Sequence, residues 1–237
     1  MKTVLITGAN KGIGFETAKQ LAQLNYFVYL GSRDKTNGEN AITKLKDAGI
    51  RNVELIEIDT TDINSIKQAK EKLENKIDAL DVLINNAGIA GAAPQNFSII
   101  EIDNLRKIFE TNFFGVVQTT QQFIRLLKKS MEPTIINVSS GLASLALHSV
   151  GNANPIYDAY SASKIALNAF TVLLAKEFKN SNFKINSVAP GYTATDLNQF
   201  KGTQTPQQAA EIIVKYMTSG NEGMTGKYLD RSGEIAW

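Results

Sequence analysis

The chain has 237 residues, of which 43% are apolar and 20% are charged, and its formal net charge is +2 at pH 7. These values are ordinary for a globular protein, and we expect one α/β domain over residues 1–237. The balanced charge does not indicate nucleic acid or an anionic membrane surface as a partner. Cysteine is absent, which excludes disulfides, thiolate catalysis and cysteine-ligated zinc, and we expect no bound metal.

Short β-branched runs alternate with longer helical patterns along the whole chain. The expected strands are 4–7, 27–30, 53–58, 82–84, 135–138, 185–188 and 227–230. The expected helices are 15–24, 39–47, 62–75, 101–128, 157–179 and 206–217. Continuous apolar strands separated by helices indicate a parallel sheet that is covered on both faces. We therefore predict a doubly wound Rossmann fold with seven parallel strands in the order 3-2-1-4-5-6-7.

The N-terminal region contains no strong targeting signal. Met1 leads within two residues into Val4-Leu5-Ile6, an apolar run that is too short for a signal-peptide core or a membrane span. We expect a cytoplasmic protein with no membrane partner.

The turn after the first expected strand is rich in glycine. Thr7-Gly-Ala-Asn-Lys-Gly-Ile-Gly14 has the spacing Gly-x-x-x-Gly-x-Gly, which differs from the commonest dinucleotide fingerprint. Glycines let the backbone turn tightly and approach a pyrophosphate without a Cβ clash. The following helix directs free N–H groups and its positive dipole end at the phosphates. An ordinary tight turn is the alternative, but three glycines directly after the first strand favour dinucleotide binding.

A second motif, Tyr160-Ser-Ala-Ser-Lys164, places a phenol and an ammonium four residues apart on one helix face. A free phenol titrates near pH ~10, so it does not exchange its proton readily at neutral pH. A nearby ammonium favours the phenolate and lowers the phenol pKa, which makes the group a usable general acid or base. Taken alone, the pair could be a solvated helix face, and the glycine-rich turn is what favours a catalytic role.

Six motifs follow one another along the chain: Thr7-Gly-Ala-Asn-Lys-Gly-Ile-Gly14, Asn85-Asn-Ala-Gly88, Asn112, Asn137-Val-Ser-Ser140, Tyr160-x-x-x-Lys164 and Pro190-Gly191. This order resembles that of the short-chain dehydrogenase/reductase family over essentially the whole chain. Within the family, three segments resemble the carbonyl-reductase branch: Asn10 to Glu16, Thr111-Asn-Phe-Phe-Gly115 and the ending from Gly226 to Trp237.

The resemblance implies a catalytic tetrad of Asn112, Ser140, Tyr160 and Lys164. Asn112 would interrupt its helix and hold a water in a proton relay with the lysine. Ser140 would hydrogen-bond the substrate carbonyl, with the adjacent Ser139 as the alternative. Tyr160 would protonate the forming alkoxide, and Lys164 would hold the ribose hydroxyls of the nicotinamide.

The resemblance also implies an NADP(H) site that comprises Gly8, Asn10, Lys11, Gly12, Ile13, Gly14, Arg33, Asp59, Thr60, Asn86, Ala87, Gly88, Tyr160, Lys164, Pro190, Gly191, Thr193 and Thr195. Asp59 would accept a hydrogen bond from the adenine amino group, although it could also cap the helix that begins near Asp62. Asn86 and Gly88 would form the turn beneath the ribose, and Thr195 would orient the carboxamide.

The end of the second expected strand favours NADPH over NADH. Its sequence Gly31-Ser32-Arg33 has no acidic residue where NAD-dependent members hold the adenosine ribose, and Asp34 is expected to point into the following loop. Arg33 can bind a 2′-phosphate through its planar fork, and Lys11 resembles the second basic residue of NADP-preferring members. The alternatives are that both cations are solvated, or that the register is shifted and Asp34 takes the ribose position.

The connection between Ser140 and Tyr160 is longer than in the shortest family members, with an extra segment near 147–155 that holds the sole histidine, His148. A Ser-His-Asp hydrolase would need a histidine, but no strand-to-helix nucleophile elbow adjoins Ser140. We interpret His148 as a loop residue or part of a pocket wall. Because the segment borders helices that build family dimers, the chain could form a homodimer or a homotetramer.

The leading hypothesis is an NADPH-dependent oxidoreductase that reduces a small ketone or aldehyde. Its substrate pocket is expected between 90–97, 142–157 and 192–200, whose apolar and aromatic residues favour an apolar or aromatic carbonyl compound. One alternative is an NAD(P)-dependent dehydrogenase that oxidises a secondary alcohol of a sugar, steroid or polyol. Another is a non-catalytic NADP(H)-binding sensor or scaffold, which the intact tetrad disfavours.

Overall fold

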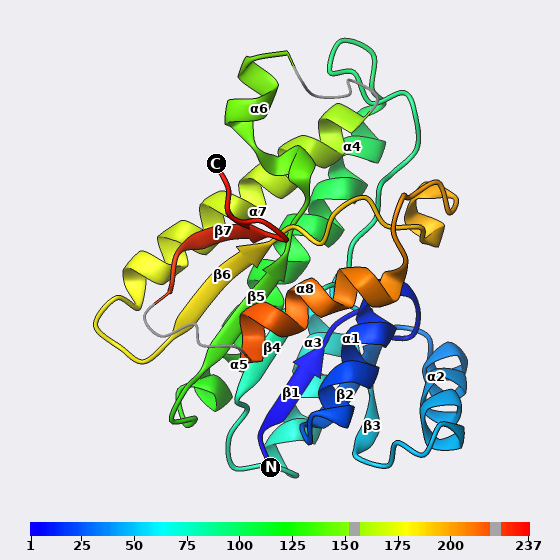
Figure 1. Ribbon diagram of the computed structural model, residues 1–237, viewed down its shortest axis with the longest axis vertical. Coiled ribbons are helices and arrows are strands. Elements are labelled where there is room, and N and C mark those ends of the chain that lie inside the picture. The colour runs from blue at the N-terminus through cyan, green and yellow to red at the C-terminus, as the bar shows by residue number, and fades with distance from the viewer. Residues whose placement is uncertain (152–156, 219–223) are drawn as a thin grey trace.

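The computed structural model describes residues 1–151, 157–218 and 224–237. Its middle layer is one eight-stranded sheet in the order β3-β2-β1-β4-β5-β6-β7-β8 (Figure 1). The strands are β1 (Thr3–Ile6), β2 (Phe27–Ser32), β3 (Val53–Glu57), β4 (Val82–Asn85), β5 (Thr134–Val138), β6 (Lys184–Val188), β7 (Lys227–Asp230) and β8 (Gly233–Glu234). The predicted order of seven parallel strands is confirmed, and β8 adds an antiparallel edge strand that the prediction missed. A strand of two residues is too short to give an alternating pattern.

The helices cover both faces of the sheet, as predicted. They are α1 (Gly12–Gln23), α2 (Lys35–Asp47), α3 (Ile63–Glu74), α4 (Ile102–Phe109), α5 (Gly115–Leu127), α6 (Leu145–Ser149), α7 (Asp158–Glu177) and α8 (Pro206–Thr218). Short turns of other helix types within the described residues are η1 (Glu110–Phe114), η2 (Gly141–Ala143) and η4 (Asp196–Asn198). Helices α1, α2 and α8 share one apolar core with the sheet, whereas α3, α5 and α7 share the other. Among the described residues, no helix has both the length and the apolar character to cross a bilayer.

The register of the central strands brings the candidate site together. Ile6 of β1 pairs with Ile84 of β4, and Val138 of β5 pairs with Val188 of β6. The carboxyl ends of these strands therefore lie at one edge of the sheet, and the turns that follow them become neighbours. Ligands bind at this edge in doubly wound sheets, at the point where the strand order reverses. In this chain, that point lies between β1 and β4.

Helix α2 begins one turn earlier than the predicted start at Glu39. Asp34 is its N-cap, because the carboxylate accepts a hydrogen bond of 2.7 Å from the backbone N–H of Asn37. This contact satisfies one of the free donors at the helix start. The first turn contains Gly38, a weak helix former, which explains why the local pattern did not indicate helix there.

Candidate active site

A cleft of about 820 Å³ follows the carboxyl ends of the strands. Every residue that was predicted to bind the cofactor lines it, and so does Ser140. Asn112 does not line the cleft and is fully buried. The cleft also has wall residues that the sequence did not single out, and these include Ile58, Thr61, Ile89 and Thr111. Tyr157 and Asp196, which also line it, lie in segments that were expected to form the substrate pocket.

The glycine-rich turn has a backbone that requires glycine. Gly8 has a φ of +62°, and a Cβ at Gly14 would lie 2.6 Å from the carbonyl oxygen of Gly8. Helix α1 starts within this turn, and no side chain of the described residues caps its N-terminus. Its first N–H groups and the positive end of its dipole therefore remain available to an anion. This arrangement fits the pyrophosphate of a dinucleotide.

The segment after β4 is held against the glycine-rich turn by hydrogen bonds. The Thr7 hydroxyl accepts from the backbone N–H groups of Asn86 at 3.0 Å and Ala87 at 3.1 Å. The Asn86 amide donates to the carbonyl oxygens of Thr7 at 2.9 Å and Gly8 at 3.0 Å. These four contacts cross-link two distant segments of the chain and give Asn86 a structural role that its motif alone did not reveal.

The end of β2 presents a cation, and not a carboxylate, to the cleft. Arg33 lines the cleft, whereas the Asp34 carboxylate is directed at the start of α2. The Ser32 hydroxyl donates to the carbonyl oxygen of Asp34 at 2.7 Å and stabilises this arrangement. The other predicted cation, Lys11, forms an exposed ion pair of 3.2 Å with Asp196. In the part of the chain that the structure describes, Arg33 forms no ion pair.

Asp59 lines the cleft after β3, and one of its carboxylate oxygens is already engaged. That oxygen accepts from the backbone N–H of Thr61 at 2.9 Å and from its hydroxyl at 2.7 Å. The alternative that Asp59 caps α3 is wrong, because the N-cap is Asp62, whose side chain accepts from the N–H of Asn64 at 2.8 Å.

Tyr160 and Lys164 lie one helical turn apart near the start of α7. The Lys164 ammonium donates to the carbonyl oxygen of Val138 at 2.7 Å and lies 5.9 Å from the centre of the Tyr160 ring. Lys164 is buried and Tyr160 is partly buried at the cleft wall, and removal from water disfavours the charged form of each. Burial lowers the pKa of Lys164 to about 8.

Burial also raises the pKa of Tyr160 to about 12, and the hydrogen bond from Ser140 opposes that rise. The expectation that Lys164 lowers the phenol pKa is therefore wrong for the protein alone. Desolvation of the phenolate is the main cause of the rise, and the Lys164 ammonium is directed at the carbonyl oxygen of Val138. At neutral pH, Tyr160 keeps its proton.

The two serines after β5 have different partners. The Ser139 hydroxyl is buried and donates to the side-chain oxygen of Asn168 at 2.8 Å. The Ser140 hydroxyl accepts from the N–H of Leu142 at 3.2 Å and forms a hydrogen bond with the Tyr160 phenol. The geometry therefore favours Ser140 as the serine that meets a substrate oxygen.

Asn112 lies in η1, a π-helical turn that joins α4 to α5 and interrupts the single helix predicted over 101–128. Its amide oxygen accepts from the N–H of Ile89 at 2.9 Å, and its amide nitrogen donates to the Ser163 hydroxyl at 3.0 Å. A Cβ at Gly88 would lie 3.2 Å from the Asn112 amide oxygen and 3.6 Å from the Lys164 nitrogen. Asn112 therefore lies directly behind the cleft wall, close to the lysine. Single π-helical turns occur often at functional sites.

His148 does not contribute to the cleft. It lies in the short helix α6, and its Nε2 atom is 2.8 Å from the carbonyl oxygen of Leu142. The interpretation of this residue as part of a loop is wrong, because the Ser144 hydroxyl accepts from the N–H of Leu147 and starts a helical turn there. The rest of the segment predicted as an insertion, 152–155, lies outside the described residues.

Two residues that the sequence did not identify support the catalytic groups. The buried Gln95 accepts from the backbone N–H of Tyr160 at 3.0 Å. Tyr228 is fully buried in β7, and its hydroxyl donates to the carbonyl oxygen of Ser140. Both contacts join residues that are 65 or 88 positions apart, so no local pattern could reveal them.

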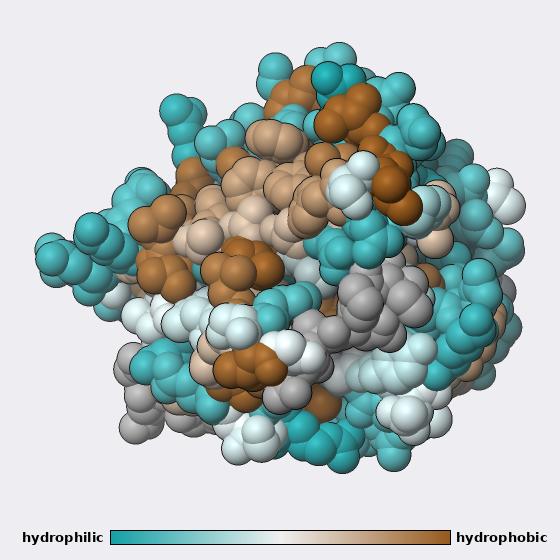
Figure 2. Space-filling view, turned by 90° about the horizontal axis from the view of Figure 1, so that it is seen from above, coloured by the Kyte–Doolittle hydropathy of each residue, from teal (hydrophilic) through white to brown (hydrophobic). Residues whose placement is uncertain are grey.

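The end of the molecule that carries α6 and α4 is partly apolar. Figure 2 views this end and shows brown side chains in patches among teal ones. The exposed large apolar residues include Phe97 and Ile99 before α4, and Leu145, Leu147 and Val150 in and beside α6. All of them except Ile99 lie within two of the segments that were predicted as substrate-pocket walls, 90–97 and 142–157.

Residues 2–206 match the family model of the short chain dehydrogenases. The chain belongs to the short-chain dehydrogenase/reductase family, and it is an oxidoreductase of that family. It is 33% identical to Short-chain dehydrogenase anuI of Penicillium roqueforti, and the match covers 99% of this chain and 97% of that protein.

Solved structures agree with this assignment. The NADPH-bound carbonyl reductase from chicken fatty liver superposes with a TM-score of 0.87 at 27% identity, over 100% of this chain and 99% of that chain. A 3-ketoacyl-(acyl-carrier-protein) reductase from Brucella melitensis, complexed with NADH, superposes with a TM-score of 0.85 at 28% identity. That match covers 97% of this chain and 96% of that chain. The fold therefore accommodates both nicotinamide cofactors.

Proposed function

We propose that this chain is an NADPH-dependent reductase of ketones or aldehydes, of the carbonyl-reductase type, in which Tyr160 is the general acid. The observation that carries the proposal is the convergence of Tyr160, Ser140 and Lys164 on the cleft that the glycine-rich turn also lines. One domain would bind the cofactor and perform catalysis, and we expect it in the cytoplasm.

The residues of the cleft suit a nicotinamide dinucleotide, which supplies hydride when bound. The N-terminus of α1 would hold the pyrophosphate, and Asp59 and Thr60 would lie against the adenine. Lys164 would bind the nicotinamide ribose, and the segment from Pro190 to Thr195 would position the carboxamide. All of these residues line the cleft.

Tyr160 is suited to donate a proton, because its raised pKa keeps the phenol neutral at pH 7. The Ser140 hydroxyl, which already bonds to the phenol, would also hold the carbonyl oxygen of the substrate. As the oxygen gains negative charge, the phenol O–H bond breaks and the proton moves to it. The phenolate that remains is stabilised by Lys164, which is charged below its pKa of about 8.

The preference for NADPH is supported by the geometry at the end of β2. Arg33 faces the cleft, and the carboxylate of Asp34 is engaged in capping α2. A guanidinium binds phosphate through paired hydrogen bonds, whereas a carboxylate in its place would repel the 2′-phosphate.

A cofactor comparison on a panel of ketones and aldehydes tests the proposal. We expect kcat/KM with NADPH to exceed that with NADH by at least about tenfold, since one charge-assisted contact is worth ~1.5–3 kcal/mol. Equal values for the two cofactors would refute the NADPH preference. Oxidation of secondary alcohols without measurable carbonyl reduction would support the dehydrogenase alternative, and tight cofactor binding without any turnover would support a sensor.

A further inference from the structure

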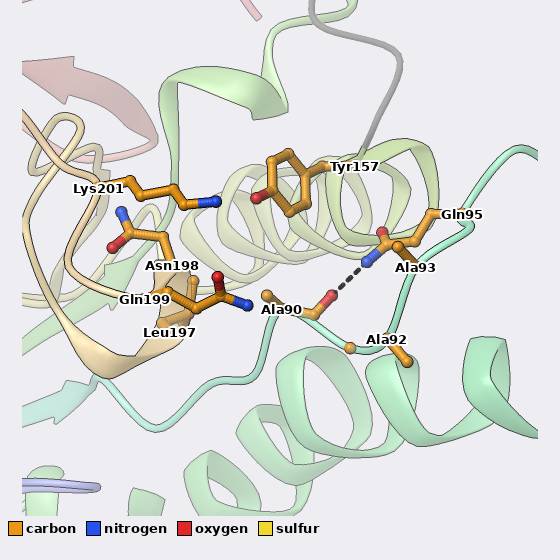
Figure 3. A pocket seen from close by; sticks show the side chains of 10 residues that line it. Ala90, Ala92, Ala93, Gln95, Tyr157, Leu197, Asn198, Gln199 and Lys201 are labelled. Carbon is orange, nitrogen blue, oxygen red and sulfur yellow. Dashed lines mark hydrogen bonds between the residues drawn. The ribbon is translucent and has the colours of Figure 1, made fainter.

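A smaller pocket of about 210 Å³ adjoins the main cleft (Figure 3). The two share Ala90, Tyr157, Leu197 and Asn198 as wall residues. A water occupies ~30 Å³ in the liquid, so the pocket has room for a small functional group and a few carbon atoms. It therefore extends the cleft away from the residues that surround the proposed reacting carbonyl.

The pocket carries a positive charge on Lys201. Among its described wall residues, Lys201 is the one with a charged side chain. Figure 3 shows the Lys201 ammonium and the Tyr157 hydroxyl pointing toward one another from facing walls. No ion pair of Lys201 occurs within the described ranges 1–151, 157–218 and 224–237.

The backbone that presents Lys201 is strained and held in place by hydrogen bonds. Gln199 and Phe200 have φ values of 57° and 60°, in the left-handed region that residues other than glycine seldom adopt. The N–H of Phe200 donates to the carbonyl oxygen of Thr195 at 2.8 Å, and the N–H of Lys201 donates to the backbone carbonyl oxygen of Asn198 at 3.2 Å. Such strain persists only where the surroundings impose it, and it is concentrated at functional sites.

The segment after Lys201 is also fixed. A Cβ at Gly202 would clash with the backbone of Thr193, so the segments around these two residues are in close contact. The N–H of Ala194 donates to the carbonyl oxygen of Gln204 at 2.9 Å. Lys201 is thus held between two fixed segments, unlike an ordinary surface lysine on a free loop.

We propose that this pocket binds the carboxylate of a keto-acid substrate, with Lys201 and Tyr157 as donors. The proposal rests on the proposed reduction of carbonyl compounds. Tyr157 precedes Tyr160 by three residues at the start of α7, which is roughly 5 Å along the helix. The carboxylate and the reacting carbonyl would therefore be separated by a short chain of carbon atoms. An ammonium and a phenol O–H form stronger, charge-assisted hydrogen bonds with a carboxylate than with an ester.

Paired substrates test the proposal by kinetics. Levulinate and its longer homologues should be reduced with a higher kcat/KM than their methyl esters. In Lys201→Gln, the ratio of acid to ester kcat/KM should fall about tenfold, mainly through KM. The expected change is of this size because an exposed cation contributes modestly to the affinity for a carboxylate. Lys201→Arg should retain most of the ratio. Lys129→Gln is the matched control, since it removes an exposed lysine beyond α5, before the amino end of β5.

Binding of non-reacting ligands gives a second readout. Calorimetry with pentanoate and pentanamide should show that the protein prefers the acid, and that Lys201→Gln removes this preference. If no carbonyl compound is reduced and the preference is still lost in Lys201→Gln, the proposed function fails and the carboxylate pocket stands. An unchanged acid-to-ester ratio together with an unchanged preference for pentanoate would overturn the pocket.

Discussion

The two halves of the cleft are built by different means. The cofactor half is made mostly of backbone: the Gly8 to Gly14 turn, the free N-terminus of α1 and the hydrogen bonds from Thr7 and Asn86. The substrate half is made mostly of side chains on irregular segments, such as 90–95 and 197–201. Backbone groups recognise what every dinucleotide shares, whereas side chains can differ with the substrate. The difference explains why the family is easier to establish than the substrate.

An ion pair links the two halves. Lys11 of the glycine-rich turn pairs with Asp196 of η4 at 3.2 Å, and both side chains are more than half exposed. Exposed pairs contribute about 0–1 kcal/mol, so this one influences the position of the two segments more than the stability of the fold.

The largest effect should come from the acid at the boundary between the halves. We expect Tyr160→Phe to lower kcat by about 10²–10⁴-fold, because the proton donor is removed. The Kd for NADPH should change little, since the glycine-rich turn and the other backbone contacts of the cofactor half are untouched. Steady-state kinetics and fluorescence titration measure the two values, and Tyr26→Phe is the matched control. Retention of wild-type kcat in Tyr160→Phe would rule out the assigned acid.

Substitutions of the two serines should have different effects, one on catalysis and the other on stability. Ser140→Ala should lower kcat by about 10²–10³-fold, since a donor to the developing oxyanion is lost. Ser139→Ala should mainly reduce the free energy of unfolding, by about 1 kcal/mol, because the side-chain oxygen of Asn168 loses this donor. Kinetics and urea denaturation of both variants check this, and the reverse ranking in kcat would identify Ser139 as the catalytic serine.

The buried lysine should make stability depend on pH. The pKa of Lys164 is about 8 in the folded protein, against an ordinary value of 10.5. Between these values the unfolded chain holds a proton that the folded protein has lost, so stability rises with pH. Across this pH range the free energy of unfolding of the wild type should rise by about 3 kcal/mol relative to that of Lys164→Met, because each pKa unit corresponds to ~1.4 kcal/mol. Urea denaturation at several pH values measures this gain, and parallel pH curves for the two proteins would contradict it.

Cofactor choice should depend on one cation of the cofactor half. Arg33→Ala should raise the Kd for NADPH roughly 10- to 100-fold and leave that for NADH almost unchanged. Arg51→Ala, which removes an arginine from the loop before β3, is the control. An equal loss of affinity for both cofactors would show that Arg33 does not read the 2′-phosphate.

The smallest effect concerns the contact between the halves. Asp196→Asn should free Lys11 for the cofactor phosphate and strengthen NADPH binding by less than about fivefold, as expected for an exposed pair. The gain should shrink as salt is added, because surface charges are screened. Titrations of NADPH at low and high ionic strength measure it, and weaker binding by the variant would show that Asp196 supports the cofactor half instead.

The sequence by itself determined the strand order, the glycine-rich turn and the positions of the four candidate catalytic residues. These features are encoded locally, because apolar runs mark buried strands and glycine spacing marks a turn that side chains cannot adopt. The alternation of strands and helices indicates a doubly wound parallel sheet, and 3-2-1-4-5-6 is the usual strand order of a dinucleotide-binding sheet. The sequence also predicted that Asp34 turns away from the cofactor site, but it missed the role of Asp34 as N-cap, because the helix was expected to start only at Glu39.

Only the tertiary structure decided the chemistry of the groups in the cleft. The pKa of Tyr160 is raised because distant segments bury it, although its neighbour Lys164 suggested the opposite direction. Gln95, Tyr228 and Lys201 reach the site across long stretches of chain, so their spacing in the sequence carries no signal. Desolvation and long-range contacts depend on how the chain is packed, and that information is absent from any short segment of it.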